Sequence, residues 1–190
     1  MNTGNVMETE DKELVKECLG GNLRKFRALV ERYKKPMYFY ALGMVGNPED
    51  AYDLSQEAFI RAYRSLNRFD SKFQFKSWLF AILSNLCKNA LRSAGIRQKY
   101  IASDKALESA PASTETNPEK IYVSKKIKEA VWDALATLDE EAREIIILKH
   151  FQDMPYKDIA EILDIPLGSV MSRLHYARLK LKKALAGVME

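Results

Sequence analysis

Apolar residues recur at helical spacing along nearly the whole of this 190-residue chain, and the pattern is interrupted once. Segments that favour strands are scarce. The interruption begins near residue 95 and includes the sequence SDKALESAPASTETNPEK, which has few residues able to build a core. We therefore expect an all-α protein made of two small helical domains, over residues 1–96 and 121–190, joined by a flexible linker over residues 97–120.

The composition limits the class of protein without identifying a partner. Hydrophobic residues make up 47% of the chain, enough for a sizeable core, and the net charge is only +4. Cys18 and Cys87 lie far apart in helical segments, and no CxxC or Cys/His metal spacing occurs, which favours buried free thiols in a reducing compartment. The polar start MNTGNVMETEDKE lacks the apolar core of a signal peptide, and no apolar run approaches the ~18 residues of a membrane span. We expect a soluble, cytoplasmic protein with no metal and no cofactor.

The sequence GNPEDAYDLSQEAF predicts the start of a helix with an unusual outer face. Asn47 is a good N-cap, Pro48 suits the first helical position, and the helix should run to about Asn67. An apolar residue ringed by charged groups is typical of a small protein-docking patch, although an ordinary polar face fits equally well. The outer face consists of Asp53, Gln56, Glu57, Ile60 and Arg64.

The segment from Ser71 to Ser103 contains no acid, but it is rich in lysine and arginine. Aromatic residues stand in or beside the loop at its start: Phe69, Phe73, Phe75, Trp78 and Phe80. Cations that follow a phosphate backbone and rings that stack on unpaired bases are what single-stranded nucleic acid requires. For the loop aromatics, burial in the core and contact with bases fit the sequence equally well. The helix that follows should place four polar residues on one face: Asn85, Lys88, Asn89 and Arg92.

The C-terminal sequence YKDIAEILDIPLGSV predicts two short helices joined by a tight turn at Pro166 and Gly168, the helix-turn-helix arrangement. No acid occurs between Asp164 and Glu190. Projected at ~100° per residue, the last helix has an apolar core face, and polar side chains oppose it, as expected of a helix in a DNA major groove. The groove-facing side chains include Met171, Ser172, His175 and Tyr176, with Arg173 and Arg178 on the flanks.

Three stretches, in this order, resemble those of bacterial RNA polymerase sigma factors of the sigma-70 family, in the extracytoplasmic-function group. They are NPEDAYDLSQEAFIRAYRSLNRFD, FKSWLFAILSNLCKNALR and YKDIAEILDIPLGSVMSRLHYARLKLKKAL. The spacing of Asp53, Gln56 and Glu57, followed by Trp78, is specific to this family. The resemblance implies a sigma2 domain that docks on the clamp helices of the largest polymerase subunit. It assigns that contact to Asp50, Asp53, Gln56, Glu57, Ile60 and Arg64.

The resemblance also implies how promoter DNA is read. The sigma2 domain would bind the melted −10 element through Phe69, Ser71, Lys72, Phe73, Phe75, Lys76, Trp78, Asn85, Lys88, Asn89 and Arg92. A sigma4 domain would contact the polymerase flap and bind the duplex −35 element through Tyr156, Lys157, Ser169, Met171, Ser172, Arg173, His175, Tyr176 and Arg178. A dedicated anti-sigma factor would cover the polymerase-binding faces.

The chain departs from the family at a few positions. The loop RFDSKFQFKS is slightly longer than is common, Met171 and Tyr176 stand where many relatives carry a basic residue, and Asp139 stands where relatives often have proline. The main alternative is a helix-turn-helix regulator that never joins polymerase; such a protein would not need the Asp53 face. A helical enzyme is the weaker alternative, because the sequence offers no phosphate loop, metal cluster or nucleophile–base pair.

Overall fold

The computed structural model describes residues 3–94 and 118–188, and every regular element in these two ranges is helical. The prediction of an all-α fold is confirmed. Most of the predicted linker lies outside the described residues, but helix α6 begins at Pro118, inside the range expected to be linker.

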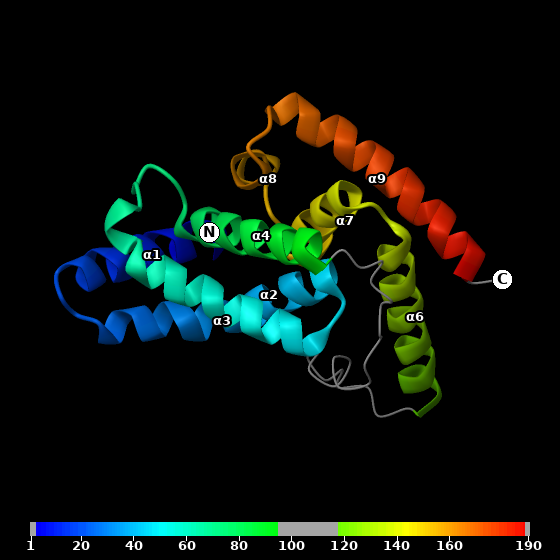
Figure 1. Ribbon diagram of the computed structural model, residues 1–190, viewed down its shortest axis with the longest axis horizontal. Coiled ribbons are helices and arrows are strands. Elements are labelled where there is room, and N and C mark those ends of the chain that lie inside the picture. Colours follow the sequence, from blue (N-terminus) through cyan, green and yellow to red (C-terminus); the bar gives the residue numbers. More distant parts are fainter. Residues whose placement is uncertain (1–2, 95–117, 189–190) are drawn as a thin grey trace.

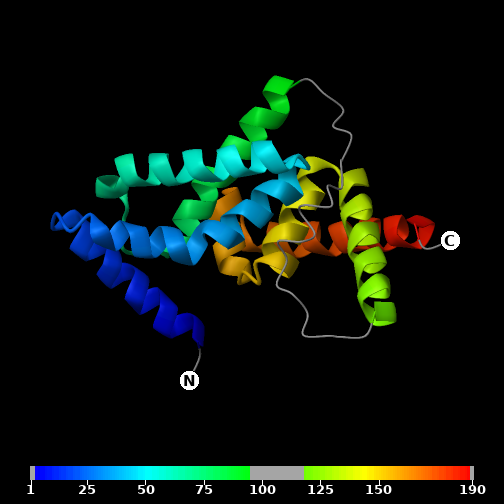
Figure 2. The ribbon, with the colours of Figure 1, turned by 90° about the horizontal axis from the view of Figure 1, so that it is seen from below.

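The N-terminal half contains four helices and one short 3-10 turn. Helices α2 and α3 lie side by side and run in opposite directions, and α4 packs against both (Figures 1 and 2). The elements are α1 (Thr3–Leu19), α2 (Arg24–Val45), α3 (Pro48–Arg64), η1 (Leu66–Arg68) and α4 (Phe75–Ala94).

Local sequence signals explain where α3 begins. Gly46 adopts a left-handed conformation with φ 74° and ends α2, and the Asn47 side chain accepts hydrogen bonds from the backbone N–H groups of Glu49 (2.8 Å) and Asp50 (3.1 Å). The predicted start is confirmed. The predicted end is too late, because α3 stops at Arg64 and the chain then forms η1.

The C-terminal half has its own helical arrangement, in which the last helix packs against both α6 and α7. The buried face of this helix includes Val170, Leu174 and Ala177, as predicted. The elements are α6 (Pro118–Thr137), α7 (Glu140–Ile146), the π-helical turn η2 (Ile147–Phe151), α8 (Tyr156–Leu163) and α9 (Leu167–Val188).

The turn between α8 and α9 differs in detail from the prediction. Asp164 takes the left-handed conformation that ends α8, with φ 52°. Gly168 lies in the first turn of α9 instead of in the connection, so a left-handed aspartate, not a glycine, reverses the chain.

The two halves pack directly on each other, which the sequence did not predict. Helix α7 and turn η2 contact α2, α8 contacts α4, and buried apolar side chains of both halves form one continuous cluster (Figure 1). One close approach is at Gly43, where a Cβ atom would lie 2.6 Å from Cδ1 of Ile147. A larger residue at this position would require the Ile147 side chain to move.

Candidate polymerase and nucleic-acid interfaces

The predicted docking face of α3 is exposed. Ile60 is 44% exposed, and Asp50, Asp53, Gln56 and Arg64 also face solvent. Glu57 is half-buried and forms an ion pair with Arg61 at 2.7 Å. On the other side of α3, Ala51, Ala58 and Ala62 are fully buried. The buried side of the helix thus consists of small side chains together with Phe59, while Tyr52, Ile60 and Tyr63 lie on the exposed side.

Two tyrosines that sequence reasoning missed extend this face. Tyr52 and Tyr63 are both exposed, and at ~100° per residue they fall beside Gln56 and Ile60 on one stripe of α3. An exposed stripe of large apolar side chains bordered by carboxylates suits a protein partner, because interface cores are enriched in aromatic residues and rims are polar. The spacing 52, 56, 60 and 63 was the available sequence signal.

The aromatic residues beside the loop divide into buried and exposed. Phe75 is 1% exposed and Phe69 is also buried; they lie 5.8 Å apart between ring centroids, and both contact the half-buried Trp78 at 5.3 to 5.8 Å. Phe73 is 48% exposed. This arrangement does not support base contacts by Phe69 and Phe75, whose rings the core occupies. It leaves Phe73, next to the exposed Ser71 and Lys72, available to a base.

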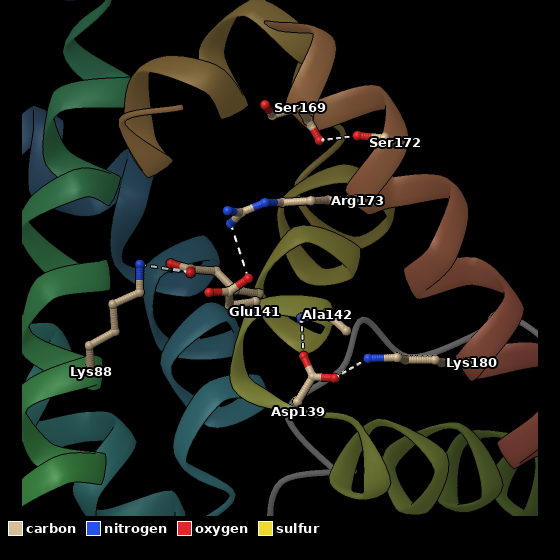
Figure 3. A network of polar contacts seen from close by, with 9 residues as sticks. Lys88, Asp139, Glu141, Ala142, Ser169, Ser172, Arg173 and Lys180 are labelled. Atoms are coloured by element: carbon tan, nitrogen blue, oxygen red, sulfur yellow. Dashed lines mark hydrogen bonds and ion pairs between the residues drawn. The ribbon is translucent and has the colours of Figure 1, made fainter. Parts of the chain in front are cut away.

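The four polar residues predicted to share one face of α4 are split between two environments. Asn85, Asn89 and Arg92 are exposed. Lys88 instead points to the C-terminal half, where its Nζ lies 2.8 Å from the buried carboxylate of Glu144 (Figure 3). Lys76 does the same at the other end of α4: it donates to the backbone oxygen of Gln152 at 3.0 Å. Burial lowers the pKa of Lys76.

The predicted recognition helix α9 presents its polar and apolar groove residues to solvent. Exposed residues include Met171, Ser172, His175 and Tyr176. The ring centroids of His175 and Tyr176 are 5.5 Å apart. The Ser172 hydroxyl donates to the backbone oxygen of Ser169 at 3.1 Å, so its lone pairs remain available to accept from a base edge (Figure 3).

The two arginines on the flanks of α9 both have partners within the domain. Arg173 forms an ion pair with Glu141 of α7 at 3.1 Å (Figure 3). Arg178 donates to Nε2 of His150 at 3.2 Å. His150 therefore accepts as a neutral imidazole, in agreement with a pKa that is lowered by burial and by the charge of Arg178. Both arginine pairs lie at the surface, where ion pairs are weak.

The remaining predicted DNA-binding residues lie around the start of the helix-turn-helix. Ser169 is half-buried in the first turn of α9, and Lys157 is exposed. Tyr156 is half-buried, with the Lys149 ammonium 5.7 Å from its ring centroid. Ser169 therefore lies on the same helix, α9, as the groove-facing side chains. Lys157 lies on α8, the preceding helix of the helix-turn-helix.

The described residues also bear on the expectations for metals, thiols and membrane spans. Within residues 3–94 and 118–188, no three His, Cys, Asp or Glu side chains gather closely enough to hold a metal ion. Cys18 and Cys87 are free and buried, as predicted, and burial raises the pKa of both thiols. No helix in the described part of the chain is long and apolar enough to cross a membrane.

Comparison with known families defines the class to which these surfaces belong. Residues 29–96 match Sigma-70 region 2, and residues 128–181 match Sigma-70 region 4. The first range contains the α3 face and α4, and the second contains the helix-turn-helix. The two matched regions lie on the two sides of the linker and each carries one of the candidate interfaces.

Similar proteins over nearly the full length narrow the class to one group. The ECF RNA polymerase sigma factor SigW of Bacillus subtilis is 31% identical over 191 residues, covering 94% of this chain and 98% of the relative. The ECF RNA polymerase sigma-E factor of Escherichia coli K12 is 34% identical over 173 residues, covering 88% and 90%. The chain belongs to the ECF group of sigma-70 family RNA polymerase sigma factors and directs transcription.

Two solved structures of similar fold are complexes with a second protein. The structure of CnrH in complex with the cytosolic domain of CnrY has a TM-score of 0.68 and 24% identity, covering 94% of this chain and 98% of that one. The sigma factor RpoE in complex with the anti-sigma factor NepR from Bartonella quintana also has a TM-score of 0.68, with 23% identity over 86% and 98%. At these identities the likeness establishes the fold.

Proposed function

We propose that this sigma factor joins core RNA polymerase through the exposed face of α3. The observation that carries the proposal is the composition of this face: Tyr52, Ile60 and Tyr63 are exposed beside the carboxylates of Asp53 and Glu57. Leaving three large apolar side chains in water is unfavourable unless a partner covers them. A DNA-binding regulator that never joins polymerase has no use for such a face.

The sigma2 domain, over residues 1–96, then binds the melted −10 element. Phe73 stacks on an unpaired base, and Ser71, Lys72 and Arg92 bind the backbone around it. Trp78, Asn85 and Asn89 recur on one side of α4 by helical spacing and border the same strand. Lys76 and Lys88 add their charge only after they leave their partners in the C-terminal half.

The sigma4 domain, over residues 121–190, places α9 in the major groove of the −35 element and contacts the polymerase flap. Ser172, His175 and Tyr176 face base edges, while Arg173, Arg178 and Lys157 bind phosphates. Met171 offers an apolar contact to a thymine methyl group. The linker, over residues 97–120, connects the two domains on polymerase.

An anti-sigma factor in the same cytoplasmic compartment would compete with polymerase for the α3 face. The support is that structures similar to this one hold RpoE with the anti-sigma factor NepR and CnrH with the cytosolic domain of CnrY. The exposed tyrosines of α3 would then be covered by either partner in turn.

The test is reconstitution with core polymerase. The purified chain should coelute with core enzyme in gel filtration, and the mixture should initiate at a defined subset of promoters in a random library. Core enzyme alone is the control. A chain that elutes separately and gives no promoter-specific transcript would overturn the proposal in favour of a free regulator.

A further inference from the structure

A buried carboxylate, that of Glu144, lies at the contact between the two halves. Glu144 of α7 is 2% exposed. Its Oε1 accepts from the Tyr40 hydroxyl at 2.8 Å and from the Ser84 hydroxyl at 2.5 Å. Its Oε2 lies 2.8 Å from Nζ of Lys88, which Figure 3 labels. All three donors belong to the N-terminal half. We call these four residues the Glu144 cluster.

Further, partly buried hydrogen bonds join the same surfaces. Arg143, the neighbour of Glu144, donates to the backbone oxygen of Met44 at 2.9 Å. Gln152 donates to the backbone oxygen of Pro36 at 3.2 Å and accepts from Lys76 at 3.0 Å. Because unpaired buried polar groups are costly, these bonds favour one fixed docking of the halves.

This docking is incompatible with the proposed binding of both promoter elements at once. The −10 and −35 elements are about 25 base pairs apart, which is about 85 Å of duplex at ~3.4 Å per base pair. Helix α4, which serves the first element, packs directly on α8 of the helix-turn-helix that serves the second. Packed helices lie about 8–10 Å apart. The halves must separate before both elements can be bound.

In the docked arrangement, two lysines proposed to bind promoter phosphates are paired with groups of the C-terminal half instead. Lys76 and Lys88 bind the backbone oxygen of Gln152 and the carboxylate of Glu144 instead of phosphates. Two other acids near the start of α7 pair with bases of α9, Glu141 with Arg173 and Asp139 with Lys180. Those two pairs are exposed, weak and confined to the C-terminal half, whereas Glu144 is buried against donors of the N-terminal half. Asp158 of α8 is also buried and its charge acts on Lys76, but the hydrogen bonds from the Tyr40 and Ser84 hydroxyls of the N-terminal half converge on Glu144.

We propose that this sigma factor holds itself off DNA, with the Glu144 carboxylate occupying Lys88 in place of a promoter phosphate and fixing α7 against α4. The proposal rests on the proposed function, since it assigns α4 and α9 to the two promoter elements. Polymerase or promoter DNA must break the Glu144 cluster, and the protein free of both stays closed.

The test compares Glu144→Gln with Glu141→Gln in the full-length chain. Glutamine keeps an oxygen that accepts from Tyr40 and Ser84 but removes the charge that holds Lys88. Glu141→Gln neutralises an acid on the same helix whose partner is exposed. Small-angle X-ray scattering of the free protein gives its compactness. Fluorescence anisotropy gives its affinity for a labelled promoter fork that carries a duplex −35 and a single-stranded −10 element.

We expect Glu144→Gln to increase the radius of gyration and to bind the fork at least ~10-fold more tightly than the unchanged chain. Glu141→Gln should keep the radius of gyration of the unchanged chain, and its affinity for the fork should stay within ~2-fold of that chain's. A compact Glu144→Gln with unchanged affinity, or an equal gain from Glu141→Gln, would overturn the proposal. If circular dichroism shows that Glu144→Gln does not fold, Tyr40→Phe replaces it, because it removes one donor to Glu144 and keeps the ring; it should shift both readouts in the same direction.

Transcription by reconstituted holoenzyme distinguishes a failure of this proposal from a failure of the proposed polymerase-binding function. If the chain does not bind polymerase, neither the unchanged chain nor any variant will support promoter-specific initiation. If only self-inhibition is wrong, all of them initiate equally and the free proteins show equal compactness and DNA affinity.

Discussion

Asp139 shows how one residue can serve two neighbouring helices. Its carboxylate accepts from the backbone N–H of Ala142 at 2.9 Å and caps α7, and its second oxygen binds the Lys180 ammonium of α9. These hydrogen bonds, Lys180 first, lower the pKa of Asp139 below its ordinary 3.8. Asp139 is therefore an N-cap of α7 that also holds the last helix.

The first prediction separates the cap from the ion pair. Asp139→Ala should lower the free energy of unfolding by about 1 kcal/mol, because an N-cap is lost. Asp139→Asn keeps an acceptor for the cap and should lose no more than about 0.5 kcal/mol, because the pair with Lys180 is exposed. Urea unfolding followed by circular dichroism measures both. Equal losses would mean that the ion pair, not the cap, provides the stability.

Lowering the pH should reduce the contribution of Asp139 to the free energy of unfolding. Because the folded state lowers the pKa of this carboxyl, the folded state binds its proton less readily than the unfolded state does. Its contribution is therefore fully present above about pH 4 and is lost as the pH falls through the lower folded-state pKa. The gap in stability between the unchanged chain and Asp139→Ala should narrow over that range, and a gap that widens would contradict the sign.

The second prediction separates a base-stacking phenylalanine from a core one. Phe73→Ala should leave stability within about 0.5 kcal/mol, because the ring is exposed. The same change should weaken promoter melting by ~1–3 kcal/mol, as one stack is lost. Permanganate reactivity of −10 thymines reports melting. Phe75→Ala is the control and should cost about 3–5 kcal/mol of stability, because its ring is buried. Unchanged melting in Phe73→Ala would remove this residue from the −10 site.

At the scale of single elements, α3 combines a buried face of alanines and Phe59 with an exposed face that carries Tyr52, Ile60 and Tyr63. The third prediction is that charge reversal at both Asp53 and Glu57 abolishes binding to core polymerase while helicity is retained, since a desolvated interface charge that loses its partner costs ~2–5 kcal/mol. Tyr52→Ala should weaken binding without any change of charge. Glu31→Lys, on an exposed part of α2, is the matched control and should bind normally. A binding titration gives each dissociation constant, and an unchanged value for the double reversal would move the docking site elsewhere.

Helix α9 carries two kinds of side chain that should respond differently to mutation. The fourth prediction is that Arg178→Ala weakens binding to all −35 sequences and reduces the log–log salt slope by roughly one unit, since each phosphate contact contributes ~0.9. Ser172→Ala or His175→Ala should change the preferred base by ~1–3 kcal/mol at one position and leave the slope nearly unchanged. Transcription from promoters varied at −35, repeated across salt, measures both. The reverse result would mean that the groove face of α9 has been assigned to the wrong side.

The elements were predictable from the sequence because their signals are local. Asn47 and Pro48 predicted the start of α3, and the apolar spacing of α9 predicted its buried face. The surroundings of the polar side chains on α4 were less predictable. Lys88 has the same spacing as the exposed Asn85 and Asn89, and nothing nearby in the sequence distinguishes a lysine that faces solvent from one that binds a carboxylate 56 positions away along the chain. Long-range partners leave no periodic signal.

For the whole molecule, the sequence correctly indicated an all-helical sigma factor, but it gave no sign that its N-terminal and C-terminal helices share a core. Glu144 looks like a surface acid in the first helical turns after LDEE, and only the structure shows that Tyr40, Ser84 and Lys88 surround it. A composition that suits a flexible linker says that the domains can move apart. It does not say whether they are apart in the free protein, because that depends on the free energy of the contact between them.

The last prediction measures that contact through Gly43 of α2 and Ile147 of η2. A Cβ added at Gly43 would lie 2.6 Å from Ile147 Cδ1, the methyl that Ile147→Val removes. In Gly43→Ala, overpacking of about 1–3 kcal/mol opposes a gain of about 1 kcal/mol in helix propensity, so the single variant is ambiguous. The propensity gain is the same with either residue at 147, so a double-mutant cycle cancels it. We expect Gly43→Ala to be tolerated better in the Ile147→Val background, with a coupling of at least about 0.5 kcal/mol by urea unfolding. Because the two residues belong to different halves, additivity within about 0.3 kcal/mol would show that the halves are not docked in solution.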